Sequence, residues 1–268
     1  MIQSVSVLSI AAMAVVAAVT VVIPIILFII LNKKVKCRQT CVLVGAGTFV
    51  VFALILETLL HQLVFHFYGK QLTDNIYLYA LYGGLAAGLF EEVGRFISMK
   101  LFMKKDLTKA NALMYGIGHG GAEMFLVGGM TYFSNIVISV LINIGQFEPM
   151  LATLDETAKS QVIEQYSALW NLPAGQFLLA AVERILALAI QICLSYIVYR
   201  AVKDKKTLLL ILAVAIHFAF DAGLVIILKK TSALVAEVIL FVAAVCFSLI
   251  VLKFFRAEKE NIETTEEM

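Results

Sequence analysis

Long apolar segments constrain the fold of this chain more than any other feature of its sequence. A helix needs about 20 mostly apolar residues to cross a bilayer. Seven segments meet this need, at roughly 5–31, 40–66, 76–99, 110–143, 173–199, 207–228 and 232–252. Only 15% of the residues are charged, whereas a soluble domain carries about 25%. The sequence therefore predicts an all-α integral membrane protein with about seven transmembrane helices, as a single polytopic membrane domain over residues 1–257.

The distribution of basic residues favours one orientation. Of the 21 Lys and Arg residues, fifteen follow the first, third, fifth and seventh segments, four lie on the opposite side and two lie within spans. Because cytoplasmic loops are enriched in Lys and Arg, we expect the N-terminus outside and the C-terminus in the cytoplasm. The first segment precedes its basic cluster, so we expect a retained span and not a cleaved signal peptide. The acidic residues 258–268 are expected to form a disordered cytoplasmic tail.

Two further regions carry specific expectations. The segment 110–143 is too long for one straight span and rich in glycine, so we expect a bend or break in it, next to a cavity or packed against protein. Residues 146–172 form the one sizeable outer loop, either a plain connector or a lid. Its surface helix would present an apolar face made of Val162, Tyr166, Leu169 and Trp170.

Ionisable residues interrupt the third span. Glu91, Glu92 and Arg95 lie within an otherwise apolar run. Each such group costs about 2.5–3.5 kcal/mol at the centre of a membrane helix, and those that occur pair with one another or line a wet cavity. The cluster is therefore a functional-site hypothesis.

Two other spans carry ionisable pairs at a spacing of four residues. His119 and Glu123 share one helix face, as do His217 and Asp221, because residues four apart are neighbours on a helix. Tyr115 lies one turn before His119 on that face. His119, His217 and the glutamate pair all fall at one depth, about eight to ten residues from the inner end of their spans. We therefore expect them to meet in one hydrated pocket.

The fifth span carries Glu183 and Arg184. Adjacent residues point about 100° apart on a helix, so we expect that they do not both face one narrow site. Arg184 is expected to pair with a buried carboxylate, either Glu123 or Glu183. Glycines flank His119. Gly84 and Gly88, which precede the glutamates, are four residues apart, a spacing typical of close helix packing.

The remaining intramembrane ionisable residues are expected to be structural. Glu57, His61 and His66 lie toward the outer half of the second span, where they would make interfacial or inter-helix hydrogen bonds. Glu237 lies near the outer end of the last span, where we expect it to contact water.

A carboxylate pair beside a histidine can activate water for hydrolysis. One glutamate takes the proton as the water oxygen attacks a carbonyl, and a second histidine with an acid one turn away can stabilise the oxyanion. No serine or cysteine is adjacent to these groups in the sequence, which disfavours a covalent nucleophile.

The ordered set Glu-Glu-x-x-Arg, aromatic-x-x-x-His and His-x-x-x-Asp resembles the glutamate-type intramembrane proteases, which include the CAAX prenyl endopeptidases, their bacteriocin-processing relatives and PrsW. The block from His119 to Glu123, together with Glu183 and Arg184, is most similar to the YhfC family of membrane peptidases. The resemblance covers the third to sixth spans.

The resemblance implies roles for individual residues. Glu91 would be the base, with Glu92 and Arg95 as its helpers. His119 would share the water, His217 would match the histidine of the third motif, and Asp221 stands where asparagine is usual. Tyr115, Glu123, Glu183 and Arg184 would support these groups.

Three functions stay open at this point. The first is a metal-independent intramembrane endopeptidase of the bacterial plasma membrane, acting on a membrane-associated peptide or protein. The second is a zinc protease using His119, His217 and a glutamate as ligands, although no H-E-x-x-H motif is present. The third is a scaffold or proton-coupled transporter using the same cavity. Nucleic acid is not an expected partner, because the basic residues lie at membrane edges.

Overall fold

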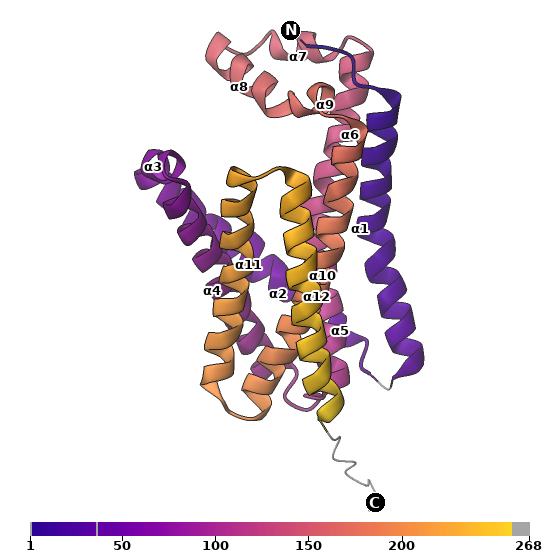
Figure 1. Cartoon of the computed structure of the whole chain (residues 1–268), viewed down its shortest axis with the longest axis vertical. Coiled ribbons are helices and arrows are strands. Elements are labelled where there is room, and N and C mark those ends of the chain that lie inside the picture. The colour runs from indigo at the N-terminus through magenta and orange to yellow at the C-terminus, as the bar shows by residue number, and fades with distance from the viewer. Residues whose placement is uncertain (1, 36, 259–268) are drawn as a thin grey trace, which may run out of the picture.

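The computed structural model describes residues 2–35 and 37–258, and over these residues the chain is a bundle of helices without a strand (Figure 1). Six helices are long and apolar enough to cross a membrane: Val7–Lys34, Thr40–Asp74, Lys109–Asn143, Ala174–Lys203, Thr207–Lys230 and Ala233–Ala257. These are α1, α2 with its continuation into α3, α5 with its continuation into α6, α10, α11 and α12. The predicted all-α multi-pass membrane fold is confirmed.

Helix α4 (Ile76–Phe102) is the predicted third span. It has 27 residues, but it is not among the six helices that are long and apolar enough to cross a membrane. Its Asn75 N-cap accepts hydrogen bonds from the backbone of Tyr77 and Leu78. The count of seven spans stays a prediction.

Two of the long helices contain π-helical segments. The segment η2 (Met124–Gly129) joins α5 (Lys109–Glu123) to α6 (Met130–Asn143), so the hydrogen bonding of the fourth span changes from α- to π-helical there, while the helix runs on without the break that was one of the two expectations. The segment η1 (Val50–Glu57) joins α2 (Thr40–Phe49) to α3 (Thr58–Asp74) and was not expected. Two glycines end η2, whereas nothing in the local sequence explains η1. Such segments occur frequently at functional sites.

Glycines bring three helices close to α5 and α4. A Cβ on Gly118 would lie 2.1 Å from the carbonyl oxygen of Val42 on α2, and one on Gly116 would lie 2.8 Å from Cα of Ile192 on α10. A Cβ on Gly84 would lie 3.0 Å from the carbonyl oxygen of Phe218 on α11. The small residues therefore act as packing contacts, as their spacing predicts.

The outer loop forms a helical cap near the N-terminus (Figure 1). It contains α7 (Phe147–Leu151), α8 (Glu156–Tyr166) and α9 (Ala168–Asn171). The expected apolar face is present, since Leu169 is part of a buried cluster with Val5 and Met13, and Val162, Tyr166 and Trp170 pack against that cluster.

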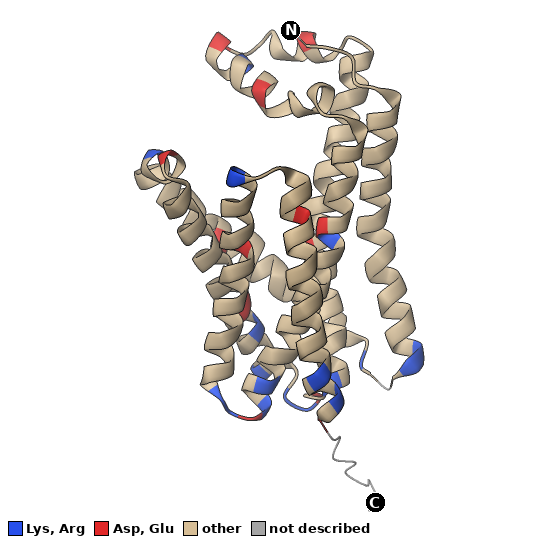
Figure 2. Cartoon of the chain, in the orientation of Figure 1, with Lys and Arg blue, Asp and Glu red and all other residues tan. Residues whose placement is uncertain are grey.

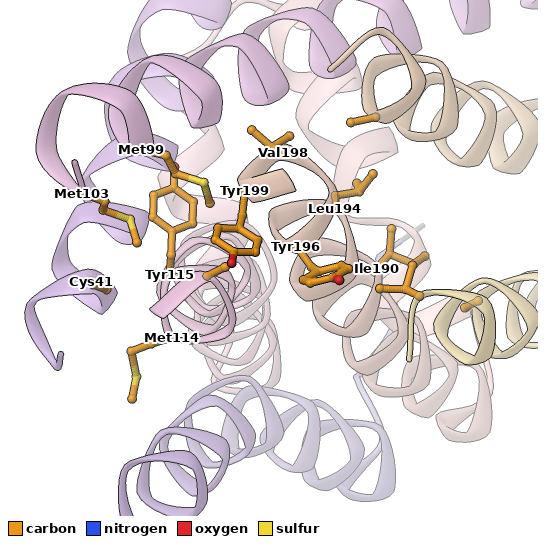
Figure 3. Packing of buried hydrophobic residues seen from close by; sticks show 14 of the residues in the cluster. Cys41, Met99, Met103, Met114, Tyr115, Ile190, Leu194, Tyr196, Val198 and Tyr199 are labelled. Atoms are coloured by element: carbon orange, nitrogen blue, oxygen red, sulfur yellow. The ribbon is translucent and has the colours of Figure 1, made fainter. Parts of the chain in front are cut away.

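Basic residues gather at the opposite end of the bundle, where α1, α4, α10 and α12 end (Figure 2). This asymmetry is the basis of the predicted orientation, which stays a prediction. Beneath it, a buried cluster joins α2, α4, α5 and α10 through residues such as Met99, Tyr115 and Tyr199 (Figure 3). This cluster packs α4, α5 and α10 against one another near the basic end of the bundle, and these three helices carry much of the candidate site.

The predicted acidic tail begins at a residue that is held in place. Glu258 accepts hydrogen bonds from Tyr196, Tyr199 and Lys203 at 2.9, 2.8 and 2.7 Å. The rest of the predicted tail, residues 259–268, lies outside the described residues.

Candidate active site

Helix α4 places both glutamates and the arginine in the interior of the bundle. Glu92 and Arg95 are fully buried, and Glu91 is 6% exposed. Because the glutamates precede the arginine by four and three residues, Nη2 of Arg95 lies 3.6 Å from Oε2 of Glu91 and 3.4 Å from Oε1 of Glu92. One guanidinium therefore lies against both carboxylates.

Gln191 of α10 (Ala174–Lys203) links this cluster to α5. Its side-chain oxygen accepts a hydrogen bond from Arg95 at 2.5 Å. Its side-chain nitrogen donates to Glu91 at 2.9 Å and to Glu123 at 2.6 Å. Arg95 also donates to the backbone oxygen of Gln191 and to Ser195, at 2.8 and 2.9 Å.

Sequence reasoning missed the central position of Gln191 and the contact with Ser195. The available signal was an amide two helical turns after Glu183 in an apolar span, followed one turn later by a hydroxyl.

Each glutamate of α4 pairs with a histidine from a different helix. His119 of α5 lies 2.9 Å from Glu91, between Nε2 and Oε2. His217 of α11 (Thr207–Lys230) lies 2.8 Å from Glu92, between Nδ1 and Oε1, and its Nε2 lies 3.4 Å from Oδ2 of Asp221. Both nitrogens of His217 thus face carboxylate oxygens, which suits an imidazolium that donates from each. The structure brings together the groups that the sequence places at one depth.

A cavity of about 90 Å³ opens among these helices. Its ionisable and amide lining comes from α4, α5, α10 and α11, and comprises Glu91, Glu123, Glu183, Arg184, Gln191, His217 and Asp221. A cavity needs about 10–15 Å³ to hold one water molecule when measured with a water-sized probe. The space is therefore sufficient for water beside Glu91 and His217.

His119 lies behind this cavity and does not line it. Its ring is fully buried, stacked on Tyr115 at 6.1 Å and met edge-on by Phe49 at 5.4 Å. The Tyr115 hydroxyl is fixed in turn by Ser98 at 2.8 Å. We expected His119 to contact the water directly. In the structure His119 contacts Glu91, and Glu91, but not His119, lines the cavity.

The Arg184 side chain pairs with both carboxylates that the sequence offered. It contacts Glu183 closely, and its Nη1 lies 3.4 Å from Oε1 of Glu123. The expectation that Glu183 and Arg184 do not face one site was wrong, since both line the cavity. The reason is the length of the arginine side chain, which bends back toward its neighbour beside Gly128, where a Cβ would lie 3.0 Å from Cδ of Arg184.

A second polar group lies between α3 and α4. Nε2 of His61 lies 3.2 Å from Oε1 of Glu57, and Nδ1 of His61 lies 2.7 Å from the Tyr82 hydroxyl. The expected inter-helix hydrogen bond is present for His61, whereas the contact of Glu57 is with His61 of the same long helix, and His66 is exposed beside the ring of Phe67.

Glu237 corrects another expectation. It is 7% exposed, and its Oε2 has no hydrogen-bonding partner among the described residues. Neighbouring helices cover the position that was expected to be wet.

Comparison with known proteins identifies the relatives of this chain. A family model described as YhfC intramembrane metalloprotease matches residues 19–242. The chain belongs to the YhfC family. A curated YhfC relative from Bacillus subtilis (strain 168), described as an uncharacterized membrane protein, is 36% identical over 211 residues, which are 78% of this chain and 81% of the relative. No solved structure matches the chain significantly.

The YhfC resemblance inferred from the motifs is confirmed, and the family description supports an intramembrane protease in a cell membrane. The wider likeness to the CAAX prenyl endopeptidases and PrsW stays a prediction.

The YhfC family description also implies a metal, and the donors can be tested for fit. His119 and His217 are each directed at a different glutamate, and the Arg95 guanidinium lies between the two carboxylates. Across residues 2–35 and 37–258, no group of three or more His, Cys, Asp or Glu side chains is arranged to hold a metal ion. The side chains in this arrangement therefore do not fit a three-ligand zinc site.

Proposed function

We propose that this YhfC-family chain is an intramembrane endopeptidase that hydrolyses a peptide bond of a membrane-associated peptide or protein with water activated by Glu91. One observation carries the proposal. The described polar contacts of the Glu91 carboxylate, with His119, Gln191 and Arg95, all involve Oε2. Since Glu91 lines the cavity, Oε1 is the oxygen available to a water molecule.

The reaction follows from this geometry in two steps. In the first, the water oxygen attacks the carbonyl carbon of the substrate while Glu91 Oε1 takes the water proton. The negative charge that develops on the carbonyl oxygen is stabilised by the positive charge of the His217 imidazolium, which lines the cavity. In the second step, Glu91 gives its proton to the amide nitrogen as the C–N bond breaks, which releases a carboxylic acid and an amine.

The surrounding residues hold these groups in position. His119 and Gln191 fix the rotation of the Glu91 carboxylate, while Glu92 and Asp221 orient the His217 ring from opposite sides. Arg95 contacts both glutamates and compensates part of their charge. Such preorganisation is worth more in a water-poor site than in solvent, because the dipoles need not rearrange during the reaction.

The test is turnover of a fluorogenic transmembrane peptide by purified wild type and Glu91→Gln in detergent micelles. A positioned general base contributes about 10²–10⁴-fold, so Glu91→Gln should lower kcat by at least about 100-fold. Glu164→Gln on the exposed surface of α8 is the matched control and should keep wild-type turnover. Normal turnover by Glu91→Gln would remove the proposal.

The family description favours a second candidate, a zinc-dependent protease. It requires the rings of His119 and His217 to leave their present carboxylate partners and turn toward one point. Stoichiometric zinc in the purified protein, with activity lost on chelation and restored by zinc, would establish it in place of the metal-independent reaction. Proton-coupled flux in liposomes without peptide cleavage would instead favour a transporter.

A further inference from the structure

A second cavity adjoins the candidate active site. A groove of about 380 Å³ lies between α3, α4 and α11, and it shares Asp221 and Leu224 with the cavity that Glu91 lines. Its volume is in the range of cavities that bind a defined ligand, about 300–1,000 Å³. The two spaces therefore meet at Asp221, one helical turn from His217.

The groove is apolar with a polar strip on one side. Phe65, Tyr79, Ala80, Leu224 and Val225 supply apolar surface. The polar strip consists of His61, Tyr82 and Asp221. A groove of this composition favours a ligand that is apolar overall but has hydrogen-bonding groups along its length.

The hydrogen bonds within the strip determine what Tyr82 offers to a ligand. Nε2 of His61 lies 3.2 Å from Oε1 of Glu57, which is 7% exposed, and Nδ1 of His61 is hydrogen-bonded to the Tyr82 hydroxyl at 2.7 Å. That bond uses either the hydroxyl proton or one lone pair of Tyr82, according to which ring nitrogen carries the proton. In both cases at least one lone pair of the Tyr82 oxygen is left to accept a hydrogen bond from a donor in the groove.

The geometry points to this groove as the site that binds the apolar segment of the substrate next to the scissile bond, in extended form, with a backbone N–H of that segment donating to Tyr82. This inference rests on the proposed protease function and specifies the substrate as a membrane-embedded peptide segment. An extended peptide exposes N–H groups that must be satisfied within the membrane. A lipid acyl chain has no hydrogen-bond donor and therefore leaves the Tyr82 oxygen unused.

Gly83 provides a direct test of occupancy. It lines the groove, and a Cβ added there meets no atom within 4 Å. A leucine at this position extends into the groove without disturbing helix packing. Gly223 on α11 is a matched control, because it is also partly exposed with open space around it but is not among the groove-lining residues.

The first experiment measures cleavage of a fluorogenic peptide of about 20 apolar residues with a central Gly-Gly pair. Gly83→Leu should raise KM at least about tenfold, while Gly223→Leu keeps the wild-type value. Tyr82→Phe should lower kcat/KM by about fivefold, as expected for one hydrogen bond. Tyr77→Phe, which alters an exposed tyrosine of α4 that is not among the groove-lining residues, is the matched control and should keep the wild-type kcat/KM. Unchanged kinetics in Gly83→Leu would overturn the inference.

A second experiment separates this inference from the proposed function. The same peptide with a photoreactive leucine is irradiated with the Glu91→Gln variant, and adducts are located by mass spectrometry. We expect adducts within residues 61–84 that disappear in Glu91→Gln/Gly83→Leu and persist in Glu91→Gln/Gly223→Leu. Adducts of this kind without any wild-type cleavage would support the groove and refute the protease. Cleavage by the wild type without these adducts would support the protease function and refute the groove as the substrate site.

A third outcome concerns lipid. If native mass spectrometry shows that Gly83→Leu expels a bound phospholipid while peptide adducts are unchanged, the groove binds lipid and the inference is wrong.

Discussion

Removing the side-chain amide of Gln191 should weaken the whole candidate site. Gln191→Leu keeps a similar volume and deletes three side-chain hydrogen bonds, to Arg95, Glu91 and Glu123. Each partner retains another contact, since Arg95 keeps Ser195, Glu91 keeps His119 and Glu123 keeps Arg184. None of the three groups is therefore left entirely unpaired.

The magnitude follows from this count. Hydrogen bonds in soluble proteins contribute about 1 kcal/mol each, whereas inter-helix hydrogen bonds in a membrane average about 0.6 kcal/mol. Three lost bonds then destabilise the fold by about 2–3 kcal/mol. The assay is reversible unfolding in mixed micelles with increasing SDS, followed by circular dichroism.

A matched control lies on the same helix. Gln176→Leu alters an exposed glutamine near the start of α10, and it should leave the free energy of unfolding within about 0.5 kcal/mol of wild type. If Gln191→Leu were equally neutral, the description of Gln191 as the link between α4, α5 and α10 would be refuted.

Two further predictions concern packing and pH. Gly118→Ala should destabilise by about 1–3 kcal/mol, because its Cβ would lie 2.1 Å from the backbone oxygen of Val42, whereas Gly47→Ala meets open space and should be neutral or stabilising in the same SDS titration. Glu258 should make stability depend on pH. Burial alone would raise its pKa, but hydrogen bonds from Lys203 and two tyrosines outweigh burial and lower it. The contribution of Glu258 to stability is present at neutral pH and is lost as the pH falls below about 4.3. Glu258→Gln should therefore lower Tm at pH 7 and remove the fall in Tm that protonation of Glu258 causes. Equal profiles of Tm against pH for the two proteins would contradict this.

The sequence predicted the features that depend on helical periodicity alone. Spacings of three and four residues placed Arg95 against its two glutamates and Asp221 against His217, and segment lengths gave the membrane helices. Depth along each span brought His119 and His217 to the level of the glutamates. These inferences need only the geometry of single helices and the thickness of a bilayer.

Features that depend on contacts between helices were not accessible in the same way. The role of Gln191 depends on the rotation of α10 relative to α4 and α5, which no local spacing encodes. The burial of His119 behind Glu91 depends on Phe49, which the sequence does not distinguish from the other apolar residues of its span. The joint orientation of Glu183 and Arg184 depended on side-chain flexibility, which the backbone angle of 100° per residue ignores.

The π-helical segment η1 sets the angular offset between two halves of one long helix. The first half, α2, packs on α5, and the second, α3, carries His61 toward Tyr82. A π-helical turn takes up more residues than an α-helical turn, and an α-helix turns by about 100° per residue, so restoring α-helical hydrogen bonding between Val50 and Glu57 without removing a residue would rotate α3 by about that angle. His61 would then swing away from Tyr82, while the half of the helix that supports His119 would stay in register.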